Sequence, residues 1–244
     1  MAVTSSISLV VLTYNEEENI EHCLESAAEW ASEIIIVDSF STDRTIEICR
    51  RYTDRIFQHA FENQAKQFNW ALDNVPIAGE WILRLDADEY VLPELAAELG
   101  QVVPTVPPDV TGLYLRRRVY FLGRWIRHGD YYPFWFLRLF RKGTGRYEEI
   151  TEEHIVLSRG RSMQLRGDFV DYNRKGLSFW TDKHNNWAIG EMLDTMSMMG
   201  HGRLPGGTVS PSLFGSQERR RRWLKLHVYV RAPLLLRAFV YFFY

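Results

Sequence analysis

Cysteine is scarce in this chain of 244 residues, which has only Cys23 and Cys49. Two cysteines make neither a disulfide framework nor a zinc site, so we expect a protein of the reducing cytosol. The N-terminus lacks the basic start and the long apolar core of a signal peptide. A run of about 18 apolar residues, which a transmembrane helix requires, is also missing. We therefore expect neither a cleaved leader nor a membrane-spanning helix.

An excess of charge of one sign is missing as well. The net charge is −2 at pH 7, so no overall basic field favours nucleic acid, and we expect no nucleic-acid partner. Two arginine runs, residues 116–118 and 219–222, are local exceptions that suit anionic surfaces or simply face solvent. With 46% hydrophobic and 25% charged residues, the composition is that of a globular protein, either one large domain or a domain with an appendage.

Short apolar runs alternate with helical periodicity in the first part of the chain. The patterns predict strands at residues 7–12, 33–37, 55–59 and 81–85, and helices at residues 19–27, 45–52, 64–74 and 93–102. Such alternation indicates a doubly wound parallel sheet. Right-handed crossovers would bring the carboxyl ends of these strands, with Asn15, Asp38 and Asp86, to one edge of the sheet.

The remainder of the chain has a different texture. A proline-rich break occupies residues 104–109. Extended segments rich in aromatic residues and arginine follow at 112–122 and 134–141, and residues 183–199 have a helical pattern. A glycine-rich loop, either a lid or a plain linker, is expected at residues 200–207.

The predicted strand at residues 81–85 runs out into three carboxylates, Asp86, Asp88 and Glu89. Open α/β sheets bind their ligands at such strand ends, and carboxylates there suit a hard divalent cation that also holds phosphate oxygens. Acidic turns at strand ends are common, however, so the pair alone is a weak signal. Asp38 is equally ambiguous, because its carboxylate suits either a nucleobase or ribose, or a cap on its own turn.

Three motifs in this order are much more specific than any one of them: residues 11–17 (VLTYNEE), 36–45 (IVDSFSTDRT) and 86–89 (DADE). Together they resemble the family-2 inverting glycosyltransferases, and in texture the bacterial lipopolysaccharide-core β-glucosyltransferases among them. The likeness continues more loosely through residues 132–133, 137–141 and 183–184. It implies an α/β GT-A fold, with a Rossmann-like, mostly parallel sheet flanked by helices, a mixed acceptor half and C-terminal amphipathic helices.

The resemblance also implies a division of the chain. Residues 1–103 would bind the nucleotide sugar, and residues 104–200 would form the acceptor half of the same domain. Residues 201–244 would contribute a loop and a basic, aromatic segment that associates with a membrane.

Individual positions acquire roles from the same resemblance. The nucleotide pocket would be lined by Thr13, Tyr14, Asn15 and Glu16. Asp38 would contact uracil or ribose, and Lys66 would approach the base or the phosphates unless it is merely solvated. Asp86 would bind ribose or a metal-bound water, and Asp88 would ligate the Mg²⁺ or Mn²⁺ that bridges the diphosphate of a UDP sugar. A cation there stabilises the negative charge gained by the leaving nucleoside diphosphate.

An inverting transfer also needs a general base for the acceptor hydroxyl. In the resembled family this is an Asp or Glu beyond the metal aspartates, often in a His-Glu pair. This chain has Thr151-Glu152-Glu153-His154 instead, so Glu153 is the first candidate and Glu152 the second. A neighbouring glutamate can raise the pKa of the working one. The alternative is a solvated acidic loop.

The end of the chain bears on the substrate and on location. Processive members of the wider family carry a Gln-x-x-Arg-Trp motif, but four residues separate Gln217 from Arg222 here, which favours transfer of a single sugar over polymerisation. Residues 218–244 mix arginines with aromatic and aliphatic residues, as in a helix at a membrane interface. A helix packed on the core or on a partner subunit is the alternative. We expect a cytoplasmic protein, peripheral on the inner face of the cell membrane.

The combined expectation is a metal-dependent hexosyltransferase that moves one sugar from a UDP sugar to a lipid-linked or lipopolysaccharide-type saccharide in cell-envelope synthesis. A nucleotidyltransferase is the competing enzyme class, but it usually opens with a glycine-rich, basic phosphate loop. Residues 13–17 are acidic and contain no glycine, which argues against that class. A non-catalytic, membrane-associated scaffold that retains a nucleotide fold is the other alternative.

Overall fold

The computed structural model describes residues 6–129, 131–148 and 154–201, and short parts of the segment beyond. These short parts are residues 212–214, 217–224, 227–228, 232–233 and 236. No helix in the described part of the chain combines the length and the apolar character of a membrane span. Both Cys23 and Cys49 are buried, free thiols.

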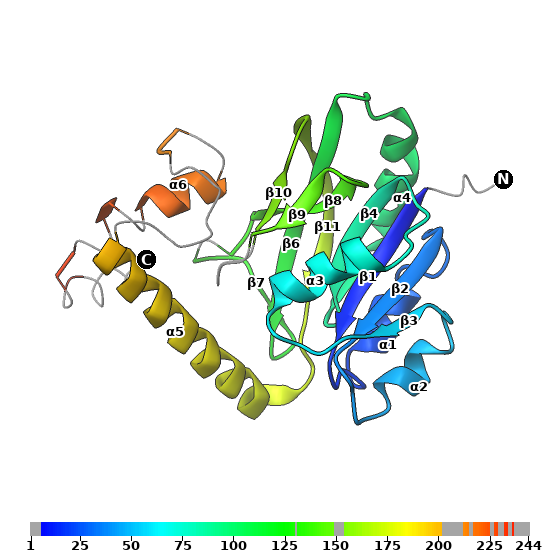
Figure 1. Ribbon diagram of the computed structural model, residues 1–244, viewed down its shortest axis with the longest axis horizontal. Coiled ribbons are helices and arrows are strands. Elements are labelled where there is room, and N and C mark those ends of the chain that lie inside the picture. Colours follow the sequence, from blue (N-terminus) through cyan, green and yellow to red (C-terminus); the bar gives the residue numbers. More distant parts are fainter. Residues whose placement is uncertain are drawn as a thin grey trace.

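A single mixed sheet organises the protein, and nine of the described strands belong to it, in the order β3-β2-β1-β4-β8-β6-β11-β5 with β7 paired to β6 (Figure 1). Its parallel half comprises β3 (Ile56–Gln58), β2 (Glu33–Asp38), β1 (Ile7–Thr13) and β4 (Trp81–Asp86). Its mixed half comprises β8 (Trp135–Arg141), β6 (Val110–Phe121), β7 (Arg124–Ile126), β11 (Arg161–Asp171) and β5 (Glu89–Val91). The expected α/β class with a mixed second half is confirmed.

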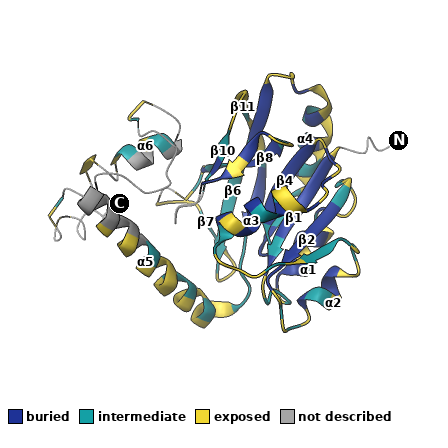
Figure 2. Ribbon diagram, viewed as in Figure 1, coloured by how far each residue is buried: buried dark blue, intermediate teal, exposed yellow. Residues whose placement is uncertain are grey.

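The apolar run that predicted the first strand is buried on both faces, as a central strand requires. Leu9 and Val11 of β1 pack into one hydrophobic cluster, and Val10 packs into the other. Side chains alternate between the two faces of a strand, so a continuous apolar run supplies both cores. In Figure 2 the central strands are correspondingly coloured as buried.

Helices cover the two faces unequally. The first cluster is covered by α1 (Ile20–Glu25), α2 (Thr45–Cys49) and α4 (Pro93–Val102), the last of which runs into a short 3₁₀ helix, η1 (Val103–Thr105). The second cluster is covered by α3 (Gln64–Asn74) and by a small two-stranded sheet of β9 (Gly145–Tyr147) and β10 (Ile155–Leu157). The helices expected at residues 64–74 and 93–102 are confirmed with those limits.

The helix expected at residues 183–199 is longer than its sequence pattern indicated. As α5 (Gly176–His201) it begins at Gly176, whose φ of +80° suits a glycine at the turn into the helix. The first turns of α5 carry aromatic and hydroxyl side chains without a clear apolar stripe, which is why periodicity missed them. In Figure 1, α5 runs outward from the edge of the sheet, and α6 (Gln217–Leu224) follows. Of the glycine-rich loop at 200–207, residues 202–207 lie outside the described part.

Candidate functional site

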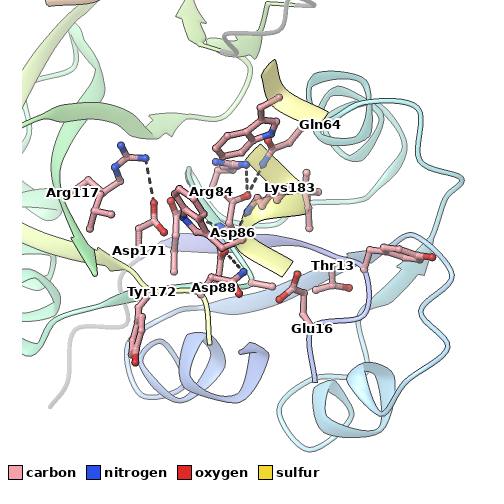
Figure 3. Close-up of a pocket in the computed structure, with 18 of the residues that line it drawn as sticks. Thr13, Glu16, Gln64, Arg84, Asp86, Asp88, Arg117, Asp171, Tyr172 and Lys183 are labelled. Carbon is pink, nitrogen blue, oxygen red and sulfur yellow. Dashed lines mark hydrogen bonds and ion pairs between the residues drawn. The ribbon is translucent and has the colours of Figure 1, made fainter. Parts of the chain in front are cut away.

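The carboxyl ends of the parallel strands lie side by side at one end of the sheet, as expected for strands joined by right-handed crossovers. In the ladders, Thr13 lies opposite Asp38, and Leu12 lies opposite Asp86. This edge borders a cavity of ≈ 2120 Å³ that is lined from both halves of the sheet and from α5. Figure 3 shows that Asp86, Asp88 and Lys183 lie together in it.

Asp86 ends β4 and is surrounded by nitrogen donors. Its carboxylate pairs with the guanidinium of Arg84, a strand residue that is only 3% exposed. Gln64 Nε2 donates a hydrogen bond of 2.6 Å to Asp86 Oδ1, and Arg138 Nη2 lies 3.7 Å from Oδ2. Burial raises the pKa of Asp86, and Arg84 opposes that rise. The charged residue inside an otherwise apolar strand therefore serves to neutralise the carboxylate at its end.

Glu89 holds the backbone of Asp86 in place. Its Oε2 accepts a hydrogen bond of 2.9 Å from the backbone N–H of Asp86, and its Oε1 lies 2.5 Å from Nη2 of Arg138. Glu89 is 2% exposed, and burial, followed by the charge of Asp86, raises its pKa well above the usual range. Glu89 also borders the cavity, but its carboxylate is buried and holds the turn that presents Asp86 and Asp88.

Asp88 is the meeting point of two distant segments. Its Oδ2 accepts a hydrogen bond of 2.9 Å from Asn173 Nδ2, and the ammonium of Lys183 on α5 lies 3.5 Å from the same oxygen. Burial acts to raise the pKa of Asp88, but Lys183 and Asn173 outweigh it and hold that pKa below its ordinary value. Asp88 is therefore ionised at neutral pH.

Lys183 lies among four carboxylates. Burial acts to lower its pKa, but the charges of Asp88, Asp86, Asp171 and Glu16 together raise it. Figure 3 shows the side chain of Lys183 entering the acidic corner from α5. The sequence pattern did not single out this lysine beyond its place in the looser part of the family likeness.

Glu16, in the loop after β1, belongs to the same charge cluster. Lys175 Nζ lies 2.6 Å from Glu16 Oε1, and Asn19 Nδ2 donates to Glu16 Oε2 at 2.7 Å. Burial, and then the charge of Asp88, raises the pKa of Glu16. The backbone N–H of Arg174 donates to Asn19 Oδ1 at 2.9 Å. The chain entering α5 is therefore fastened to the loop after β1.

Of the residues predicted to line the nucleotide pocket, Thr13, Tyr14, Asn15 and Glu16 all border the cavity. Asp38 does not. It is 0% exposed, and its carboxylate accepts hydrogen bonds from Thr13 Oγ1 at 3.0 Å, from the N–H of Ser41 at 2.9 Å and from Gln58 Nε2 at 3.1 Å. The alternative that Asp38 caps its own turn is thus the arrangement found. It positions the loop through which Ser39 reaches the cavity.

The structure does not bring Lys66 into the cavity. The ammonium of Lys66 pairs with Glu62 one turn away on the surface, and Gln64 and Gln67 are the α3 side chains that border the cavity. The two candidate bases, Glu153 and Glu152, lie outside the described residues.

Sequence reasoning missed Asp171, which ends β11 inside the cavity. Its Oδ2 lies 3.3 Å from Arg117 Nη1, as drawn in Figure 3. Burial, and then the charge of Asp88, raises the pKa of Asp171 to about 6. The available signal was its position at the end of a strand, the same signal that identified Asp86.

The donor set at this corner fits a hard divalent cation in one particular way. Among the described residues, no three side chains of the metal-binding types are arranged to hold a metal by themselves. Mg²⁺ commonly takes only one or two protein carboxylates and completes its shell with water and substrate phosphates. Asp88 and Asp86 provide that number of carboxylates at the cavity, so the site suits an ion that arrives with a diphosphate.

Comparison with known proteins agrees with this geometry. Residues 8–167 match the model of glycosyl transferase family 2. The lipopolysaccharide core biosynthesis glycosyltransferase LpsC of Rhizobium meliloti (strain 1021) is 31% identical over 153 residues, which are 61% of this chain and 55% of LpsC. The glycosyltransferase SunS of Bacillus subtilis (strain 168) is 30% identical over 101 residues, which are 41% of this chain and 24% of SunS. The chain thus spans about half of LpsC and less of SunS.

A solved structure with the same fold is that of S. aureus TarS, residues 1–349, in complex with UDP-GlcNAc. It superposes with a TM-score of 0.51 at 18% identity and covers 70% of this chain and 59% of that one. This likeness supports the GT-A arrangement of the sheet. Because the family model spans more than half of its residues, the chain belongs to glycosyl transferase family 2.

Proposed function

We propose that the chain is a metal-dependent inverting hexosyltransferase that transfers one sugar from a UDP sugar to a lipid-linked or lipopolysaccharide-type saccharide. The observation that carries the donor part is the position of Asp86 and Asp88 at the strand end beside Lys183. The similarity to LpsC, a glycosyltransferase of lipopolysaccharide core biosynthesis, supports the acceptor class.

The loop after β1 is proposed to hold the nucleoside. Thr13, Tyr14, Asn15 and Glu16 border the cavity, and Tyr14 is 57% exposed, so its ring is available to a ligand. Asn15 Oδ1 accepts a hydrogen bond of 2.8 Å from the N–H of Thr42, which ties this loop to the turn after β2. Asp38 is proposed to act through that turn rather than by direct contact.

The acidic corner is proposed to manage the charge of the leaving diphosphate. Mg²⁺ or Mn²⁺ bound there would supply Lewis-acid stabilisation of the charge that develops on the leaving group. Asp88 would hold the ion, and Asp86 would orient ribose or a water. Lys183 supplies a fixed positive charge at the same place, and a preorganised charge costs no reorganisation during the reaction.

Glu153 is proposed as the general base that deprotonates the acceptor hydroxyl, and Glu152 is the second candidate. The segment that contains them joins β9 to β10, and the flanking residues Tyr147, His154 and Ile155 all border the cavity. This placement of the two ends supports a base at the cavity. Asp171 is the alternative among the described carboxylates, because a pKa of about 6 suits general base catalysis near neutral pH.

Cytoplasmic location at the inner face of the membrane is proposed from the basic, aromatic segment 218–244. Deleting this segment should release the protein from anionic liposomes in a flotation assay. Flotation of the shortened chain with the liposomes would contradict the membrane role.

The donor assignment is tested with the purified full chain. UDP should bind in calorimetry, more tightly with Mn²⁺ than with EDTA, and a panel of UDP sugars should show slow metal-dependent hydrolysis of one member. Tighter binding of GDP or dTDP than of UDP would overturn the UDP assignment. Absence of binding by every nucleoside diphosphate would overturn the glycosyltransferase proposal as a whole.

A further inference from the structure

The cavity face of α5 carries a row of rings beside the acidic corner. Trp180, Lys183, His184 and Trp187 recur at intervals of three, one and three residues, which places them on one side of a helix. All four border the cavity. We call Trp180, His184 and Trp187, together with Phe121 of β6, the aromatic wall.

The rings of the aromatic wall touch one another in sequence. His184 stacks on Trp180 with ring centroids 3.7 Å apart and an interplanar angle of 26°. Trp187 follows at 5.0 Å from His184, and Phe121 lies 5.0 Å from Trp180 on the other side. The wall is therefore a continuous surface that joins α5 to the end of β6.

The wall is open to solvent, which distinguishes it from core packing. Trp180 is 38% exposed and Trp187 is 54% exposed. Large exposed aromatic surfaces in a concave site mark positions for a ligand. The wall starts beside Asp86 and Asp88. The ammonium of Lys183 lies 3.5 Å from Oδ2 of Asp88 and 5.2 Å from the ring centroid of Trp187.

Saccharides match such a surface chemically. A sugar ring presents a face of C–H groups, which packs against aromatic rings, and a rim of hydroxyls, which needs hydrogen-bond partners. His184 provides one such partner. Its Nδ1 donates the 2.8 Å hydrogen bond to the backbone oxygen of Trp180, because a carbonyl oxygen can only accept. The other ring nitrogen, Nε2, is then left to accept a hydrogen bond from a hydroxyl of a sugar stacked beside it.

We propose that the aromatic wall is the acceptor subsite, where the saccharide that receives the sugar stacks on Trp180 and Trp187. The inference rests on the proposed function, since it places the acceptor beside Asp86 and Asp88, the residues proposed to hold the donor. A membrane is a different occupant for exposed aromatic residues, and the experiment separates the two.

The test uses the full chain and a lipid-free probe, namely core oligosaccharide released from rough-type lipopolysaccharide by mild acid. In calorimetry, Trp187→Ala should weaken oligosaccharide binding about tenfold or more, whereas Trp187→Phe should stay within about threefold of the unchanged chain. Ile189→Ala is the matched control, because Ile189 is 55% exposed on α5 and does not border the cavity. UDP binding with Mn²⁺ should be unchanged in all three variants.

Four outcomes decide whether the subsite is correct, and a fifth bears on the proposed function. Weakening by Trp187→Ala with recovery by Trp187→Phe supports the subsite. Equal oligosaccharide affinity in Trp187→Ala and the unchanged chain overturns it, as does failure of a UDP-binding chain to bind the oligosaccharide. Loss of flotation with anionic liposomes in Trp187→Ala, with oligosaccharide binding intact, also overturns it in favour of a membrane contact. Failure to bind any nucleoside diphosphate would instead count against the proposed function.

Discussion

The ammonium of Lys183 lies 3.5 Å from Oδ2 of Asp88, so α5 delivers a cation to the carboxylate that follows β4. The two residues come from opposite halves of the chain. Among the described residues, Lys183 is the cationic side chain paired with Asp88. A metal ion that binds Asp88 would therefore compete with Lys183 for this carboxylate.

Asp88→Asn should remove most metal-dependent UDP binding and lower kcat by about 100-fold or more, because an electrostatic contact to the leaving group is lost. Calorimetry with UDP in Mn²⁺ and in EDTA measures the first effect. Asp73→Asn is the control, since Asp73 pairs with Arg146 on the surface and does not border the cavity. Equal stimulation by Mn²⁺ in Asp88→Asn and the unchanged chain would rule out a metal role for Asp88.

Lys183→Met should weaken UDP binding in EDTA by about tenfold, because the fixed positive charge near the diphosphate is gone. Lys183→Arg should restore part of this affinity. The same Lys183→Met change should also tighten Mn²⁺ binding, measured by electron paramagnetic resonance, since Asp88 loses its competing partner. Lys142→Met, at an exposed position away from the cavity, is the control. If UDP affinity in EDTA is the same with and without the Lys183 ammonium, the diphosphate role is wrong.

Glu153→Gln should abolish transfer to the acceptor while UDP binding stays intact, because only deprotonation of the hydroxyl is affected. Glu152→Gln, one position away, is the matched comparison and should retain most activity. The reverse result would move the base to Glu152. Full activity of both variants, with loss in Asp171→Asn, would move it to Asp171.

Asp171 should make stability depend on pH. Its folded pKa of about 6 exceeds the ordinary value of 3.8, so the folded state binds more protons than the unfolded state between these limits. Its contribution is therefore complete below about pH 4 and is lost as pH rises through 6. Asp171→Asn lacks this loss, so the free energy of unfolding of the variant relative to the unchanged chain should rise on the order of 1–3 kcal/mol from pH 4 to pH 7. Urea titrations at several pH values measure it, and a difference that does not change with pH would contradict the raised pKa.

Much of the fold of residues 1–103 could be predicted from the sequence because its signals are local. The apolar run of β1 predicts a strand buried on both faces, and the helical pattern of residues 64–74 predicts α3. The carboxyl ends of parallel strands lie at the same end of a sheet. The sequence alone therefore predicts that Asp86 and Asn15 lie near each other.

Other features depend on contacts that no local pattern encodes. Nothing near Lys183 in the sequence indicates that α5 turns it toward Asp88. Asp38 was ambiguous because nucleobase contact and turn capping need the same residue type, and only its burial separates them. The three-residue strands β5, β9 and β10 are too short for an alternating pattern, so they were missed.

The strand order has a geometric consequence for the cavity itself. Asp86 and Glu89 are three residues apart, a distance of at most about 11 Å. Yet β4 and β5 are separated in the sheet by β8, β6 and β11, and four inter-strand steps in a flat sheet would span about 19 Å. Both can hold only if the sheet curls back on itself at this end. The concavity at this end of the sheet therefore follows from the hydrogen-bonded order of the strands. A substitution that flattens this curvature would open the cavity without changing any residue that lines it.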